Sequence, residues 1–208
     1  SHAQNVILLI HGNSASKEFF ENFMDQKELD SFRLIAVDLP GHGQSDPFPS
    51  SIEDAIINNG DLLFKSPQNF YTFSGYANVL NIFLKILKIS SENVSLFGWS
   101  LGGHIAIEMV EKEPNLNLAI LSGSPIASFK DMADGFEPLK QMLLPAPFEG
   151  YSVFELLGFN KHFSSEQAIF FHSLGGIRNA QLSEKAGMAT HPSARHYVVK
   201  FALGTSQY

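Results

Sequence analysis

The 208-residue sequence contains no cysteine and only one tryptophan, and it lacks any run of basic residues. Without cysteine, disulfides, thiolate catalysis and cysteine-based zinc sites are excluded. Lysine and arginine number 14 against 21 aspartates and glutamates, so we expect neither a nucleic-acid partner nor binding to an anionic membrane surface. No apolar run approaches the roughly 20 residues needed to span a bilayer. The first residues resemble a buried strand and not a signal peptide, which favours a cytoplasmic protein.

The first half of the sequence alternates apolar runs typical of buried strands with segments of helical periodicity. Ser16 is a plausible N-cap for the first helix, and Thr72 or Ser74 for the second. This alternation predicts a parallel sheet joined by right-handed crossovers. The expected strands are residues 5–10, 32–38, 93–98 and 116–123, and the expected helices are residues 16–29, 72–89 and 100–114.

The motif Gly98-Trp99-Ser100-Leu101-Gly102 lies between the third expected strand and a helix. Its pattern, G-x-S-x-G, is typical of a sharp turn that exposes a serine hydroxyl above the end of a strand. The two glycines let the backbone pass closely, and the N–H of Leu101 at the helix start favours a developing oxyanion. The alternative is a packing turn in an unrelated α/β protein.

A second turn, His11-Gly12-Asn13, follows the first expected strand. An acyl-transfer site needs another N–H donor for the oxyanion, and we assign it to the backbone of Asn13. We expect the His11 ring to be structural, with contact to substrate as the alternative, and we expect Trp99 to contact substrate.

The segment "VDLPGHGQSD" follows the second expected strand. Gly41 and Gly43 suit turns with positive φ, and Asp38 and Ser45 suit local capping. A metal site at Asp38 and His42 is a weaker alternative, so we expect scaffold near the mouth of the site and predict neither a metal nor a cofactor.

These three motifs, "HG", "DLPGHGQSD" and "GWSLGGH", resemble the α/β-hydrolase superfamily, most closely its lid-bearing, esterase-like members. The resemblance covers residues 5–125. It implies an α/β fold with a partial parallel sheet of about four strands, flanking helices and a helical cap. It also implies that Ser100 is the nucleophile and that Asn13 and Leu101 form the oxyanion hole. A serine at the elbow argues against relatives that place aspartate there, namely haloalkane dehalogenases and epoxide hydrolases.

The resemblance also implies an acid and a histidine base in later core strands, and the sequence shows neither strand. We therefore expect a chain truncated before these two groups and inactive by itself. The histidines after Ser100 are weaker candidates for the base. We expect His104 to be structural, and the remainder fall in the expected cap: His162, His172, His191 and His196. Asp131 and Asp134 are weaker candidates for the acid.

Two domains are expected, a hydrolase core at residues 1–125 and a helical cap at residues 126–208. The expected cap is rich in apolar residues, which indicate either an apolar substrate pocket or ordinary packing between helices. They are Phe148, Phe154, Leu157, Phe159, Phe163, Phe170 and Phe171. The predicted function is hydrolysis of a small, apolar carboxylic ester through a Ser100 acyl-enzyme. Hydrolysis of peptide, thioester, lactone or carbon–carbon bonds, or a non-catalytic binding role on the same fold, remain alternatives. The sequence does not indicate an oligomeric state.

Overall fold

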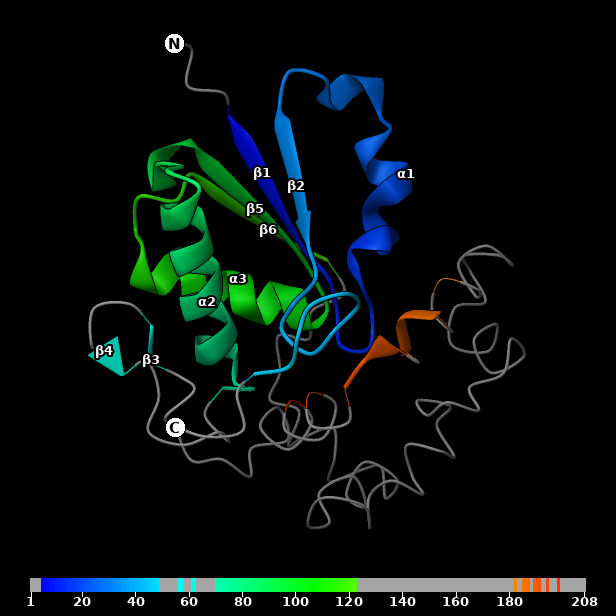
Figure 1. Ribbon diagram of the computed structural model, residues 1–208. Coiled ribbons are helices and arrows are strands. Elements are labelled where there is room, and N and C mark those ends of the chain that lie inside the picture. The colour runs from blue at the N-terminus through cyan, green and yellow to red at the C-terminus, as the bar shows by residue number, and fades with distance from the viewer. Residues whose placement is uncertain are drawn as a thin grey trace, which may run out of the picture.

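A four-stranded parallel sheet forms the centre of the molecule (Figure 1). The computed structural model describes residues 5–48, 56–57, 61–62 and 70–122, together with residues 182, 185–187, 189–191, 194 and 198. The strand order is β2-β1-β5-β6, which confirms the α/β class and the four expected strands. Their bounds are Val6–Ile10 for β1, Arg33–Val37 for β2, Val94–Trp99 for β5 and Leu118–Ser122 for β6.

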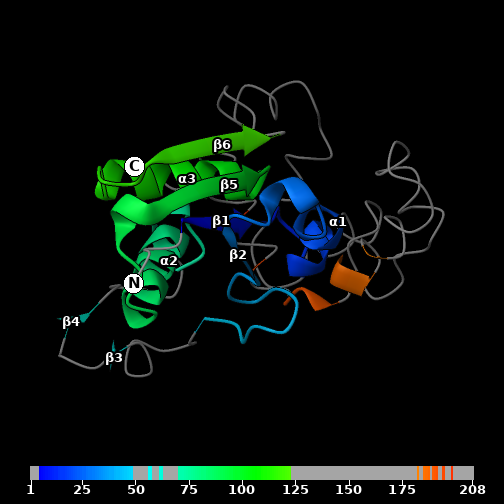
Figure 2. The same cartoon turned by 90° about the horizontal axis from the view of Figure 1, so that it is seen from above.

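Helices cover both faces of this sheet, with α1 on one side and α2 and α3 on the other (Figure 2). The two longer helices, α2 and α3, pack against each other and against the sheet. A short antiparallel pair of strands, β3 and β4, was not expected from the sequence. The remaining bounds are Lys17–Phe20 for η1, Glu21–Met24 for α1, Lys27–Leu29 for η2, Ile56–Ile57 for β3, Asp61–Leu62 for β4, Phe73–Ile86 for α2, Ser91–Asn93 for η5 and Leu101–Lys112 for α3.

Helix α2 illustrates how the sequence forms these elements. The hydroxyl of Thr72 accepts a hydrogen bond from the Gly75 N–H at 2.9 Å, so Thr72 is the N-cap. Tyr76, Leu80 and Leu84 recur at helical spacing and are buried in the core that α2 shares with β1, β5 and α3. The predicted helix and its threonine cap are therefore confirmed.

The single helix predicted over residues 16–29 is wrong, because this segment is divided into η1, α1 and η2. Ser16 precedes η1 but makes no capping hydrogen bond through its side chain. The N–H of Lys17 instead donates to the carboxylate of Asp38 at 2.8 Å, and Gln26 adopts extended backbone angles before η2. A long-range contact thus fixes the first turn of a segment whose local pattern favours one helix.

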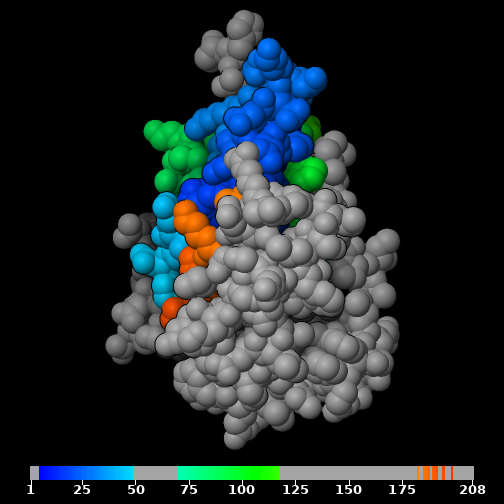
Figure 3. Space-filling model, turned by 90° about the vertical axis from the view of Figure 1, so that its right-hand side faces the viewer, coloured from blue at the N-terminus to red at the C-terminus, as the bar shows by residue number. Residues whose placement is uncertain are grey.

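Most of the expected cap, residues 126–181, lies outside the described residues, so the division at residue 125 stays a prediction. Toward the C-terminus, the described residues pack onto the core. The N–H of His191 donates to Gly41 O at 2.7 Å, and Ala194 and Val198 are buried in the core cluster. Figure 3 shows this segment, in orange, beside the light-blue loop that follows β2. Within the described part of the chain, no helix is long and apolar enough to cross a membrane.

Candidate active site

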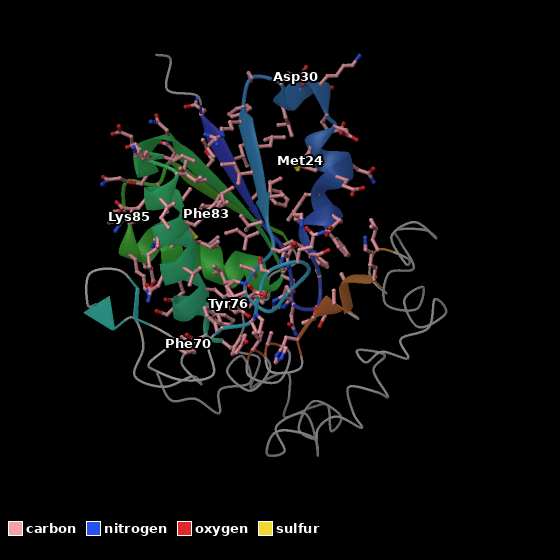
Figure 4. All side chains as sticks on the ribbon, in the orientation of Figure 1. Met24, Asp30, Phe70, Tyr76, Phe83 and Lys85 are labelled. Atoms are coloured by element: carbon pink, nitrogen blue, oxygen red, sulfur yellow. The ribbon has the colours of Figure 1, made fainter. Side chains whose placement is uncertain are left out.

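The carboxyl ends of β1 and β5 lie side by side, because Ile10 is paired with Gly98 in the parallel ladder. The strand order reverses at this point, since β1 has β2 on its other side. In open α/β sheets such a switch point leaves a crevice in which ligands bind. In Figure 4, Tyr76 and Phe70 lie toward this end of the sheet, whereas Phe83 and Lys85 lie farther along α2.

Ser100 occupies the turn between β5 and α3, as the motif predicted. Its backbone angles are φ 53° and ψ −115°, a region that non-glycine residues rarely adopt. Such a conformation costs on the order of 1–3 kcal/mol and persists only where the surroundings enforce it. Residues in such conformations cluster at active sites, which makes this serine the first candidate for chemistry.

The two glycines of the motif remove the side chains that would prevent this turn. A Cβ added at Gly98 would collide with the backbone of Gly102 and Gly103. One added at Gly102 would collide with the carbonyl groups of Ile10 and His11. The start of α3 is therefore pressed directly against the end of β1.

The turn after β1 completes this arrangement. A Cβ added at Gly12 would lie 2.9 Å from the Trp99 ring and 3.2 Å from the Ser100 Cβ, so the turn runs directly past the serine. The turn is closed by a hydrogen bond of 3.3 Å from the Ala15 N–H to Gly12 O. Among the described residues, the Asn13 N–H donates no hydrogen bond to a backbone carbonyl. Leu101 is the first residue of α3, so its N–H has no partner within the helix.

His11 is fully buried, and both of its ring nitrogens are engaged. Its Nε2 accepts from the Leu39 N–H at 3.0 Å, so the ring carries its proton on Nδ1 and donates to Gly12 O at 2.7 Å. Burial lowers the pKa of His11 from 6.5 to about 4, which keeps the ring neutral. This geometry agrees with the expected structural role, in which His11 ties the turn after β1 to the loop after β2.

The loop after β2 is held by Asp38. Its carboxylate accepts from the backbone N–H groups of Lys17 at 2.8 Å and Gln44 at 3.0 Å, and pairs with the Lys17 ammonium at 2.5 Å. Burial raises the pKa of Asp38, but these donors outweigh it and hold that pKa below its usual 3.8. Gly41 and Gly43 have φ of 76° and 54°, as expected, and the Ser45 hydroxyl donates to Asp38 O.

His42, on the same loop, is completely buried and lies beside the turn after β1. Its Nε2 is 3.3 Å from Asn13 Oδ1, and its ring centroid is 5.1 Å from that of His11. The sequence places both residues just after neighbouring strands but gives no sign of this side-chain contact. Within the described residues, no group of three or more metal-ligating side chains is gathered.

The structure describes three of the remaining predicted site residues: Trp99, His104 and His191. Trp99 is half-buried and stacks on Phe19 with a centroid distance of 4.8 Å. His104 stacks on Phe73 of α2 at 4.7 Å, and burial lowers its pKa, in agreement with a structural role. His191 is exposed. The other proposed groups lie outside the described residues: His162, His172, His196, Asp131, Asp134 and the apolar residues 148–171.

Several known proteins of related structure act on esters or lactones. A mutant of N-acyl homoserine lactonase AidH, complexed with N-hexanoyl homoserine lactone, is 27% identical with a TM-score of 0.66; the match covers 99% of this chain and 66% of that one. The esterase RhEst1 from Rhodococcus sp. ECU1013 is 21% identical with a TM-score of 0.61, covering 95% and 65% of the two chains, which shows a common fold.

The curated relatives are longer than this chain. An uncharacterized protein of Mycobacterium tuberculosis is 34% identical over 110 residues, which make up 53% of this chain and 26% of that protein. A haloalkane dehalogenase of Psychrobacter cryohalolentis is 25% identical over 143 residues, or 68% of this chain and 41% of that one. The family model described as "alpha/beta hydrolase fold" matches residues 5–154. That match spans most of the sequence, and the chain therefore belongs to the α/β-hydrolase family.

Proposed function

We propose that this chain carries the nucleophile and oxyanion hole of a serine hydrolase that cleaves small carboxylic esters, including cyclic ones. The observation that carries the proposal is the strained Ser100 turn, which is packed against Gly12 in the turn after β1. The likeness to an N-acyl homoserine lactonase over nearly the whole chain supports ester or lactone carbonyls as the substrate class. Since the elbow residue is serine, the proposal does not extend to the dehalogenase reaction.

The chemistry follows from these positions. A base removes the Ser100 proton, and Oγ attacks the carbonyl carbon to give a tetrahedral intermediate. Its oxyanion accepts hydrogen bonds from the N–H groups of Asn13 and Leu101, with the dipole of α3 adding to the stabilisation. The intermediate collapses, the alkoxide leaves with the proton held by the base, and water then hydrolyses the acyl-enzyme. In a lactone the leaving alcohol stays attached, so the product is a ring-opened hydroxy acid.

The proposal assigns the base and its acid partner to residues outside the described part of the chain. Both ring nitrogens of His11 are engaged, and the ring of His104 stacks against α2. The chain also spans only 66% of the lactonase structure, so the activity proposed is that of the whole protein. The expected cap at residues 126–208 would form the apolar side of the substrate site.

Hydrolysis of p-nitrophenyl butyrate and of N-hexanoyl homoserine lactone tests the proposal. The whole protein should cleave at least one of these, and Ser100→Ala should lower kcat by about 1,000-fold or more. Ser90→Ala is the matched control, because Ser90 is exposed and its side chain makes no capping hydrogen bond. An inactive wild-type protein, or full activity in Ser100→Ala, would refute the assignment.

A further inference from the structure

His42 is a buried polar side chain that the proposed reaction does not use. Its ring is 0% exposed and lies between Pro40 O, 3.2 Å from Nδ1, and the side chain of Asn13, 3.3 Å from Nε2. Buried polar groups are normally retained with their hydrogen bonds satisfied, because an unsatisfied one destabilises the fold. One of its partners, Asn13, is the residue whose N–H is the proposed oxyanion donor.

The loop that carries His42 is firmly held. The His42 N–H donates to Leu39 O at 2.9 Å, and His42 O accepts from the Ser45 N–H at 2.9 Å. The adjacent Gly41 is bonded on both sides, through its N–H to Asp46 O at 2.9 Å and through its carbonyl to the His191 N–H at 2.7 Å. The backbone on both sides of the His42 ring is therefore held in place by hydrogen bonds.

The turn that carries Asn13 is less firmly closed by its own backbone. Among the described residues, the turn is closed by one backbone hydrogen bond, from the Ala15 N–H to Gly12 O at 3.3 Å. Ser14, the next residue, has φ of 55°, in the left-handed region that non-glycine residues seldom adopt. A turn of this kind needs an outside contact to keep its N–H in one direction.

The hydrogen-bond roles around His42 follow from its partners. Pro40 O can only accept, so Nδ1 carries the proton and Nε2 of a neutral ring is an acceptor. Asn13 must then present its Nδ2–H to Nε2, which requires a 180° rotation of the amide that exchanges Oδ1 and Nδ2.

We infer that His42 is a positioning residue: its Nε2 accepts a hydrogen bond from the Asn13 side chain and thereby aims the Asn13 N–H at the oxyanion formed on Ser100. The inference rests on the proposed function, because it gives Asn13 the donor role. It links the loop after β2 to the reaction without placing His42 in contact with substrate. A displacement of about 1 Å in such a donor can lower the rate by roughly 100-fold.

Substitution of Asn13 by any residue except proline removes the side-chain contact with His42 but keeps the backbone N–H. The effect of such a substitution on kcat therefore measures how much the side chain contributes to positioning that N–H. Asn13→Ala and His42→Leu should each lower kcat by roughly 10- to 100-fold with KM nearly unchanged. The double variant should be no slower than the slower single variant, because both changes remove the same hydrogen bond. His42→Gln retains a polar group near the Nε2 position and should recover most of the rate.

Thr72→Ala is the matched control, since it removes a hydrogen bond of the fold at the start of α2. It should lower the melting temperature and leave kcat unchanged. An unchanged kcat in Asn13→Ala, losses that multiply in the double variant, or a His42→Gln variant as slow as His42→Leu would overturn the inference.

Nuclear magnetic resonance separates this inference from the proposed function. In the ¹⁵N-labelled protein, we expect a scalar coupling through the hydrogen bond between Asn13 Nδ2 and His42 Nε2, whether or not the protein turns over ester. Absence of that coupling while both resonances are assigned would overturn the positioning role. An inactive wild-type protein that shows the coupling would refute the proposed function alone.

Discussion

The turns after β1 and after β5 lie side by side at the candidate site, but they are held in different ways. The turn after β5 depends on the absence of side chains, since no Cβ can be accommodated at Gly98 or Gly102. The turn after β1 depends on buried polar groups, namely the rings of His11 and His42 and the carboxylate of Asp38. One turn is fixed by close backbone packing and the other by hydrogen bonds from a neighbouring loop.

This difference implies different sensitivities. Close packing leaves no room for added atoms and has no titratable group, so the turn after β5 should respond to volume and hardly to pH. Buried imidazoles and carboxylates change charge with pH, so the turn after β1 should respond to acid. Two substitutions and one change of pH distinguish these sensitivities, with expected effects on stability that decrease from the first to the last.

Gly102→Ala should give the largest loss of stability. The added Cβ would meet backbone atoms of Ile10 and His11, which cannot rotate away as a side chain can. We expect a loss of about 3 kcal/mol in the free energy of unfolding, which corresponds to roughly 6–12 °C in melting temperature. Gly187→Ala is the control, because none of the described residues lies within 4 Å of its added Cβ and the residue is helical, so its stability should be equal or slightly higher. Equal stability of the two variants would contradict the packing account.

Lowering the pH should decrease the free energy of unfolding, because His11, which holds the turn after β1, is buried in its neutral form. The pKa of His11 is about 4 in the folded chain against 6.5 when unfolded, so the unfolded chain takes up the proton first as pH falls. Stability should therefore fall below about pH 6.5, by about 2 kcal/mol between pH 7 and pH 5. Urea unfolding at both pH values measures this loss, and His11→Gln should remove most of it despite its own lower stability. An equally large pH effect in His11→Gln would show that other groups are responsible.

Ser100→Gly should give the smallest effect and the opposite sign. Glycine adopts φ of 53° readily, so this change should relieve strain and raise the free energy of unfolding by about 1 kcal/mol. Ser100→Ala keeps the Cβ and the strain, so its melting temperature should stay near that of the wild type. If both variants melt alike, the turn is not strained in the way its backbone angles indicate.

The sequence predicted the elements around the site because local signals specify them. The elbow glycines, the apolar strands and the threonine cap of α2 each act within a few residues, and the structure confirms the strand, turn and helix around Ser100. Gly41 and Gly43 were likewise predictable, since turns with positive φ favour glycine.

Contacts between distant segments were not predictable from these signals. The first turn of the segment at residues 17–29 is held by the Lys17–Asp38 pair, whose members are 21 positions apart. The contact of His42 with Asn13 joins residues 29 positions apart, and it exists because β1 and β2 are neighbours in register. Periodicity and turn composition do not encode such pairs, so the side chains that hold the turn after β1 appear only in three dimensions.

Covalent labelling of Ser100 tests the central claim most directly. The whole protein is treated with a fluorophosphonate, which reacts with activated serines, and the modified peptide is identified by mass spectrometry. We predict one adduct, on Ser100, that is absent in Ser100→Ala and retained in Ser90→Ala. No adduct in the wild-type protein, or an adduct that persists in Ser100→Ala, would contradict the assignment of Ser100 as the nucleophile.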